Sequence, residues 1–195
     1  MAYRSGESFT ILTVCTGNIC RSPAAERLFR SAFEPEDEVA VESAGTGPLV
    51  DEPIHGPMAA LLRGIEVDVE DFAARHLAED MIERADLILA MTREHRSAVV
   101  DLLPAAVRRT FTLREFARLA AQVDRSELDA QAGPEATPGA RLQVLMDLAA
   151  RHRSPVPAEQ DDVVDPFRQE ESVYRESFDQ ILPAVRTICR IALDL

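Results

Sequence analysis

Short apolar runs alternate with helical patterns along this chain, and this alternation predicts an α/β fold in which a parallel sheet carries helices on both faces. The length of 195 residues is enough for one domain with a substantial single core. The composition is that of a globular protein, with 46% hydrophobic and 28% charged residues. We therefore expect a single three-layer α/β domain over residues 1–195.

The strands are predicted from runs of apolar and β-branched residues, over residues 9–14, 38–44, 85–91 and 107–111. Helical patterns predict helices over residues 23–33, 54–62, 79–84, 94–103 and 170–193. Ser22 can cap the first helix, and Pro23 suits its first turn. Gly64 and Pro104 are expected to end two of the others, and Pro183 should bend the last.

The stretch 123–160 differs in amino-acid composition from the rest of the chain. Clusters of Gly and Pro at 133–139 and 154–157 flank a segment of helical composition at 140–152. The stretch is too short to form a core of its own. We therefore expect an inserted loop and helix within the one domain rather than a second domain.

Charge and cysteine content exclude several classes of function. The net charge of −13 argues against nucleic acid or an acidic membrane face as a general partner. No apolar run approaches the length of a membrane span, and the first residues lack a signal-peptide core. An odd number of cysteines, three, without framework spacing fits a reducing compartment. We expect a cytoplasmic protein.

The string CTGNICRSP, residues 15–23, lies between the first predicted strand and the first predicted helix. A loop between a strand and a helix N-terminus binds anions through its backbone N–H groups and the helix dipole. The same setting favours the thiolate form of a cysteine, which is its nucleophilic form. Arg21 adds a planar guanidinium that can hold two phosphate oxygens at once. The pattern indicates phosphoryl transfer through a phosphocysteine on Cys15.

This string resembles the signature of the low-molecular-weight branch of the protein tyrosine phosphatases, and the resemblance covers residues 9–121 and 161–193. It implies a four-stranded parallel sheet of order 2-1-3-4. It also implies hydrolysis of phosphotyrosine in phosphorylated proteins, with phosphate or vanadate-like anions binding in the loop. Neither a metal nor a cofactor is expected.

The resemblance also implies roles for single residues. Cys15 is the expected nucleophile, and Arg21 the group that binds the equatorial phosphate oxygens. Ser22 can donate a hydrogen bond to the sulfur, Asn18 holds the loop conformation, and Ser43 hydrogen-bonds to Asn18. The residues expected to bind substrate are Thr16, Gly17, Asn18, Ile19, Cys20, Arg21, Ser22, Leu49 and Phe167.

A phosphocysteine pathway needs a proton donor for the leaving oxygen and then a base for the attacking water. In the family this group is the aspartate of an Asp-Pro pair followed by aromatics, and Asp165-Pro166-Phe167 matches that pattern. The proline restricts the backbone of Asp165 and helps to fix its carboxylate. The rival carboxylates Asp161 and Asp162 are expected to be solvated loop charges.

The remaining cysteines and histidines give weaker signals. The family pattern implies a reversible disulfide between Cys20 and Cys15, whereas simple packing of Cys20 is an equal alternative. Cys189 lies on an apolar helical face and is expected in the core. The four histidines have no metal-ligand spacing, and a structural role is expected for His76.

The chain departs from the family pattern at three places that bear on substrate choice. Met91-Thr92 stands where family members have Met-Asp after the third strand. Phe167-Arg168 replaces a pair of aromatics, and Leu49 stands where many members have an aromatic wall. The insertion at 123–160 could lie near Asp165 as a lid or a partner surface.

Alternative functions of the same loop stay open at this point. Arginine phosphatases of this fold typically have threonine before the second cysteine, where this chain has Ile19, which favours phosphotyrosine. Arsenate reductases of this fold need two further cysteines in a segment where residues 80–110 have none. A non-catalytic anion sensor is the weakest alternative, because nucleophile, arginine and acid are all present.

Overall fold

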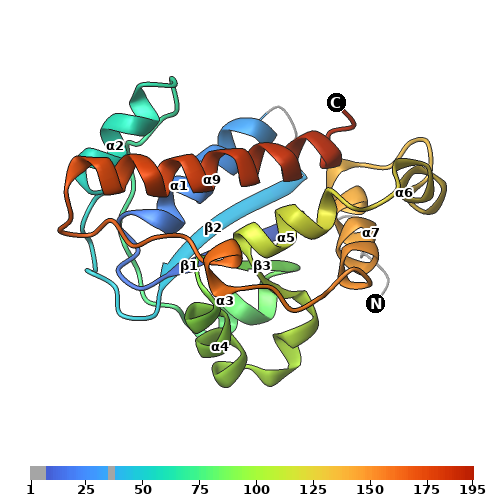
Figure 1. Ribbon diagram of the computed structural model, residues 1–195, viewed down its shortest axis with the longest axis horizontal. Helices are drawn as coiled ribbons and strands as arrows, with labels where there is room; N and C mark the ends of the chain where they lie inside the picture. The colour runs from blue at the N-terminus through green and yellow to red at the C-terminus, as the bar shows by residue number, and fades with distance from the viewer. Residues whose placement is uncertain (1–7, 35–37) are drawn as a thin grey trace.

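The computed structural model describes residues 8–34 and 38–195. Its centre is a parallel sheet with strands in the order β2-β1-β3-β4 (Figure 1). The strands are β1 (Phe9–Cys15), β2 (Val39–Gly45), β3 (Leu87–Ala90) and β4 (Thr110–Thr112). The predicted fold class and strand order are confirmed.

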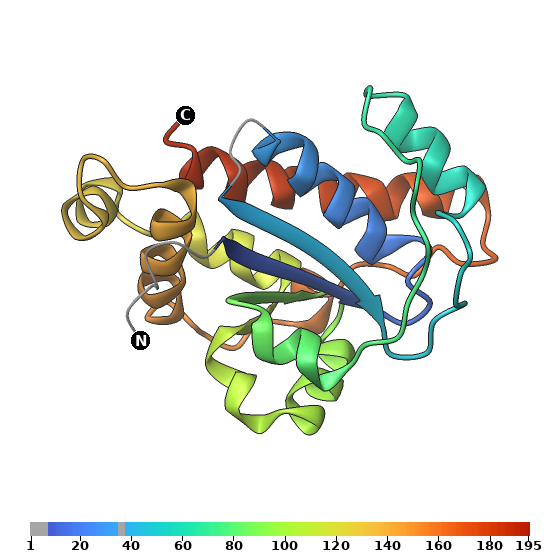
Figure 2. The same cartoon turned by 180° about the vertical axis from the view of Figure 1, so that it is seen from behind.

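The two faces of the sheet are covered by different helices, as Figures 1 and 2 show. On one face α1 (Arg21–Phe33), α5 (Leu113–Ala120) and α9 (Glu171–Ala192) share a large hydrophobic cluster with alternate strand residues such as Ile11. On the other face α3 (Glu79–Arg84) and α4 (Arg93–Leu102) pack on the residues in between, such as Leu12. The helix α2 (Gly56–Arg63) contacts α9 at the edge of the first layer. This alternation is the two-residue period of a strand that is buried on both faces.

The prediction for the fourth strand was wrong in its position. Residues Pro104–Arg109 form a 3₁₀ helix, and β4 begins only at Thr110. Pro104 is the first residue of this helix, a position that suits the fixed φ of proline, and the Thr110 hydroxyl donates to the Ala106 carbonyl at 2.8 Å. Val107, which suggested a strand, is 41% exposed on this turn.

One detail of the helix ends differs from the predictions. The hydroxyl of Ser22 does not cap α1, because the helix already begins at Arg21. Gly64 follows the last residue of α2 as predicted, with a φ of −62° rather than a left-handed conformation. The helix α9 continues through Pro183, which lies on the exposed side where water can satisfy the freed carbonyl.

The stretch 123–160 holds more helix than predicted, namely α6 (Arg125–Ala132), α7 (Pro138–Ala150) and the short α8 (Ala158–Asp161). Leu142 and Leu145 of α7 lie in the same hydrophobic cluster as α5 and α9. Figure 2 shows α6 and α7 beyond the amino ends of the strands, whereas the loop 16–20 follows the carboxyl end of β1. After α8 the chain continues to Val163, whose carbonyl accepts a hydrogen bond from Arg21 at the end of this loop.

No helix in residues 8–34 and 38–195 is long and apolar enough to cross a membrane.

Candidate functional site

The loop between β1 and α1 places Cys15 at the carboxyl end of the central strand. Its side chain is buried, and its Sγ lies 2.9 Å from the Ser22 hydroxyl oxygen. Among the described residues, no backbone amide of residues 16–20 donates a hydrogen bond to another group of the chain. These amides precede a helix of 13 residues, so they and the helix dipole can bind an anion above the sulfur.

Asn18 holds the shape of this loop. Its φ of 51° lies in the left-handed region, which asparagine tolerates better than most residues. Its side-chain amide donates to Ser22 Oγ at 3.0 Å and to Ser43 Oγ at 2.9 Å, and its Oδ1 accepts from the Arg75 amide at 2.9 Å. The expected contact between Asn18 and Ser43 is present.

A buried carboxylate that the sequence analysis missed continues this chain of hydrogen bonds. The hydroxyl of Ser43 donates to Glu26 Oε2 at 2.5 Å, and Arg30 lies 3.3 Å from the other oxygen of this carboxylate. Glu26 is 3% exposed. Its partner Ser43 comes from β2, 17 residues further along the chain, so no local pattern in the sequence indicated the contact.

Gly45, at the end of β2, allows the loop to pass close by. A Cβ atom there would lie 2.4 Å from the Thr16 carbonyl oxygen, which no side chain could tolerate. After Gly45 the chain runs along the loop, because the amides of Gly47 and Leu49 donate to the carbonyls of Thr16 and Gly17 at 3.1 Å. Leu49 therefore stands beside the loop, and it is 43% exposed.

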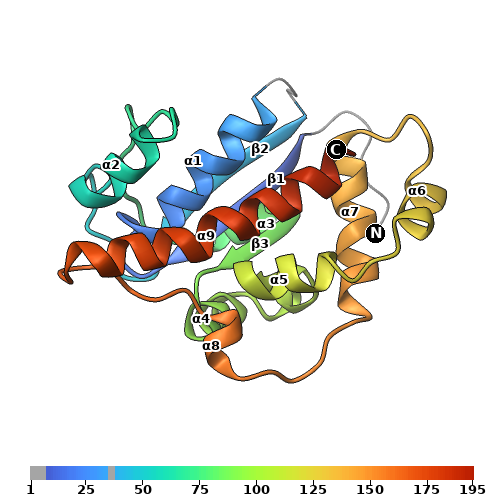
Figure 3. The same cartoon turned by 45° about the horizontal axis from the view of Figure 1, so that its top comes forward.

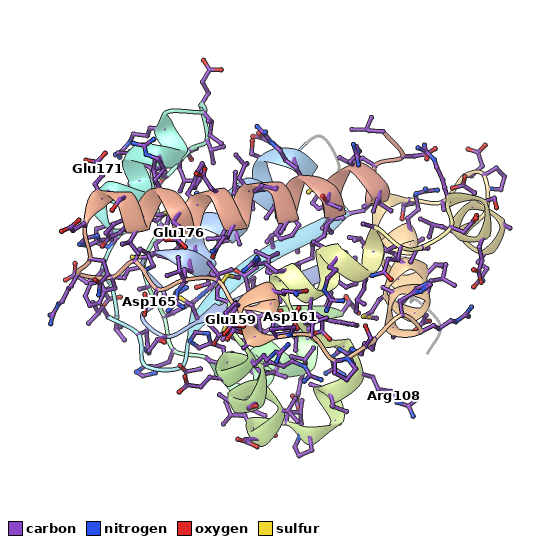
Figure 4. All side chains as sticks on the ribbon, viewed as in Figure 1. Arg108, Glu159, Asp161, Asp165, Glu171 and Glu176 are labelled. Carbon is purple, nitrogen blue, oxygen red and sulfur yellow. The ribbon has the colours of Figure 1, made fainter. Side chains whose placement is uncertain are left out.

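Arg21 joins the loop to a distant part of the chain. Its Nη1 donates to the Val163 carbonyl at 3.3 Å, and its Nη2 lies 2.9 Å from Asp165 Oδ2. The guanidinium is nearly buried, whereas the Asp165 side chain is 54% exposed. Figure 4 shows Asp165 on the segment that follows α8, apart from the labelled carboxylates of α8 itself. The fold thus brings Asp165 to Arg21, which closes the loop that begins at Cys15.

The prediction that Asp161 and Asp162 are solvated loop charges was wrong. Asp161 is 5% exposed, and its carboxylate lies 2.7 Å from Arg93 Nη2 and 3.0 Å from Arg118 Nη2. Asp162 Oδ1 accepts the Arg93 amide at 2.8 Å, at the start of α4. Figure 3 shows α8 next to α4. Both carboxylates are therefore structural partners of arginines and of a helix N-terminus.

A small aromatic cluster lies behind Phe167. The His55 ring meets Phe167 edge-on at 5.8 Å and stacks on Tyr174 at 5.6 Å. The Tyr174 hydroxyl lies 3.0 Å from His55 Nδ1, and the His55 amide donates to the Ile19 carbonyl at 2.8 Å. The sequence analysis missed the roles of His55 and Tyr174, because α2 and α9 bring them together over 119 residues of chain.

The other two cysteines are buried and free. Burial raises the pKa of Cys20 to about 12, and the neighbouring Cys15 and Asp165 add to the effect. Burial alone raises the pKa of Cys189 to about 12, and the expected core position of this residue is confirmed. Cys15 and Cys20 are both free thiols in this structure.

His95 also reaches the loop, which the sequence analysis did not anticipate. Its Nε2 lies 2.8 Å from the Thr16 hydroxyl, and its Nδ1 lies 2.8 Å from the Thr92 hydroxyl. Burial lowers the pKa of His95 to about 4, helped by the positive charge of Arg21. This histidine is therefore neutral over the ordinary pH range.

Within residues 8–34 and 38–195, no group of three or more His, Cys, Asp or Glu side chains is placed to hold a metal ion.

Fold and site together define a class of parallel α/β proteins in which a Cys-x5-Arg loop joins the first strand to the first helix. The family model described as low molecular weight phosphotyrosine protein phosphatase matches residues 10–136, and the chain belongs to this family.

The similar proteins include some named as tyrosine phosphatases and others named as arginine phosphatases. The chain is 43% identical over 95 residues to the low molecular weight protein-tyrosine-phosphatase Etp of Escherichia coli, a match that covers 49% of this chain and 62% of that protein. It is 38% identical over 109 residues to the protein-arginine-phosphatase of Bacillus subtilis, with 54% and 71% covered. The solved YwlE arginine phosphatase from Geobacillus stearothermophilus has a similar fold, with a TM-score of 0.66, 25% identity, and 93% and 91% covered. The chain thus spans less than two thirds of the length of Etp.

Proposed function

We propose that this protein is a phosphatase that hydrolyses phosphotyrosine in proteins through a phosphocysteine intermediate, without a metal or another cofactor. One observation carries the proposal. The buried guanidinium of Arg21 follows Cys15 in one anion-binding loop and lies 2.9 Å from the carboxylate of Asp165. Nucleophile, phosphate clamp and proton donor thus stand at one site, as membership of the family leads one to expect.

In the first step, the Cys15 sulfur attacks phosphorus, and the bond from phosphorus to the tyrosine oxygen breaks. Asp165 donates its proton to that leaving oxygen. Arg21 and the loop amides bind the three equatorial oxygens, where negative charge is spread in the transition state. The Asn18 network holds the loop in this geometry beforehand, so little reorganisation is needed.

In the second step, water attacks the phosphocysteine, and Asp165 accepts the proton of that water. The bond between sulfur and phosphorus breaks, and inorganic phosphate forms. The hydroxyl of Ser22, 2.9 Å from the sulfur, donates to the thiolate as it leaves. The same carboxylate thus serves as acid and then as base.

Phosphoarginine is the second candidate substrate, favoured by the arginine phosphatases among the similar proteins. Against it stands Ile19, where arginine-directed members typically have threonine. Ile19 is 4% exposed and offers no hydroxyl to a guanidinium. Leu49 is exposed beside the loop, and Phe167 follows Asp165 by two residues with His55 packed against it. These two apolar side chains suit an aromatic ring.

We propose that residues 1–195 act as one phosphatase domain, because α7 of the insertion shares its hydrophobic cluster with α5 and α9. A cytoplasmic location stays a prediction from the cysteine content of the sequence.

The proposal is tested by comparing turnover of phosphotyrosine peptides, phosphoarginine peptides and arsenate under one set of conditions. Phosphotyrosine should be the fastest substrate, and Cys15→Ser should abolish its turnover while vanadate still binds, because the loop amides and Arg21 remain. Retained turnover in Cys15→Ser would end the phosphocysteine mechanism. Faster turnover of phosphoarginine by the wild-type protein would make the second candidate the correct one.

A further inference from the structure

His95 lies at the start of α4 with both ring nitrogens hydrogen-bonded to threonines, although the proposed mechanism does not use it. Its Nε2 lies 2.8 Å from Thr16 Oγ1, and Thr16 is the residue after Cys15. Its Nδ1 lies 2.8 Å from Thr92 Oγ1. The ring is 5% exposed, so its orientation is set by these two contacts and by packing.

The contacts of Thr92 are compatible with one particular direction for these hydrogen bonds. This threonine caps α4, and its hydroxyl oxygen accepts the backbone amide of His95 at 3.3 Å. Its own proton can then go to Nδ1 of His95. In that arrangement Nε2 carries the ring hydrogen and donates it to Thr16 Oγ1, and the hydroxyl proton of Thr16 remains free to be donated elsewhere.

The surroundings of the ring keep this arrangement constant. The charged groups that face His95 are Arg21 from α1 and Asp165 from the segment after α8. Burial and Arg21 both oppose an imidazolium, and the attraction of Asp165 is weaker. A neutral ring has one donor and one acceptor, so one of its nitrogens donates to a threonine hydroxyl and the other accepts from one.

We propose that His95 is a positioning residue for the phosphate-binding loop, acting through Thr16. By donating to Thr16 Oγ1, it fixes the residue beside Cys15 and leaves the Thr16 hydroxyl proton available to an anion in the loop. The inference rests on the proposed function only for its turnover readout. Anion binding and the ring tautomer test it separately.

The first test compares three variants of the full-length protein. His95→Leu removes both hydrogen bonds at similar volume, whereas His95→Gln keeps an N–H donor for Thr16. Val99→Ala is the matched control. Val99 is fully buried in the same helix, α4, but it packs in the hydrophobic cluster with Leu12 and Ile88. Melting temperature, vanadate affinity and kcat/KM are measured on each.

We expect His95→Leu to weaken vanadate binding and kcat/KM about 10-fold, below the loss of a direct transition-state donor, and His95→Gln to regain most of it. Val99→Ala should lower the melting temperature with little change in either. A His95→Leu effect that matches Val99→Ala at equal melting temperature would overturn the inference. If the wild-type protein failed to hydrolyse phosphotyrosine, dependence of vanadate affinity on His95 would still support it.

The second test reads the ring itself. In ¹⁵N-labelled protein at pH 7, the nitrogen shifts of His95 should be those of a neutral ring with the hydrogen on Nε2. Thr16→Val should abolish the effect of His95→Leu on vanadate affinity, because the two act through one contact. A hydrogen on Nδ1, or independent effects of the two substitutions, would contradict the inference.

Discussion

Two segments meet at the site, and they are held in place by different interactions. The loop 15–22 is fixed by buried, mostly neutral side chains such as Asn18, Ser22 and Ser43. The segment 156–165 is fixed by arginines of α4 and α5. Arg93 reaches the Val156 carbonyl at 2.7 Å, and Arg114 reaches the Asp162 carbonyl at 2.6 Å.

These two kinds of interaction suggest different roles for the two segments, one in catalysis and the other in stability. Short neutral side chains in a buried network have few conformations, so they place atoms accurately around the sulfur. Long arginines hold the second segment through charge, and a buried carboxylate that loses its partners is costly. Substitutions in the loop should therefore affect the rate more than folding, and substitutions in the arginine network should do the reverse.

The largest effect is expected where the two segments touch, at Arg21. Arg21→Lys should lower kcat/KM for an aryl phosphate by several powers of ten, because an ammonium cannot bind two oxygens in the fixed geometry of a guanidinium. Steady-state kinetics and circular dichroism on the same sample would separate this loss from unfolding. Near wild-type activity would make Arg21 a structural residue only.

A substitution of Asp165 tests whether the segment 156–165 takes part in the reaction. Asp165→Asn should slow substrates with basic leaving groups by about 10²–10⁴-fold, and substrates with acidic leaving groups far less, because only a basic leaving group needs a proton. Asp162→Asn is the control, since that carboxylate faces the start of α4. If the control steepened the dependence on leaving-group basicity and Asp165→Asn did not, the acid would be Asp162.

Asp161 tests the arginine network directly. Asp161→Asn should lower the free energy of unfolding by about 2 kcal/mol, within the range for hydrogen bonds to charged groups, because Arg93 and Arg118 remain partly solvated. Glu171→Gln, which touches only the exposed pair with Arg175, should change it by less than about 0.5 kcal/mol. Urea unfolding measures both. Equal effects would mean that the buried pair contributes no more than a surface pair.

The smallest effect is expected for the two cysteines with pKa values near 12. Below pH 9, Cys20 and Cys189 should stay protonated in the folded protein and resist iodoacetamide, which needs a thiolate. Because folding raises both pKa values, their stabilisation is complete below pH 9 and is lost as the pH rises toward 12. Mass spectrometry of labelled peptides at pH 8 would check this. Rapid labelling of either residue in the native protein would contradict it.

The sequence predicted the loop well because its signal is local. Strand, CTGNICRSP and helix follow one another within 25 residues, from Phe9 to Phe33. The helix α5 was missed although Thr112 and Glu115 form a capping box, a pattern that sequence alone can reveal. The position of Asp161 could not be predicted in the same way, since its partners come from helices more than 40 residues away.

Helices α6 and α7 lie at the end of the molecule away from the loop, and the turn between them exposes Pro134 and Glu135. A peptide tag inserted at this turn would lie far from the phosphate-binding loop. The protein could be tethered to a sensor surface there with its loop facing the solution. Attachment at this turn would therefore allow anion binding to be measured while the phosphate-binding loop stays accessible.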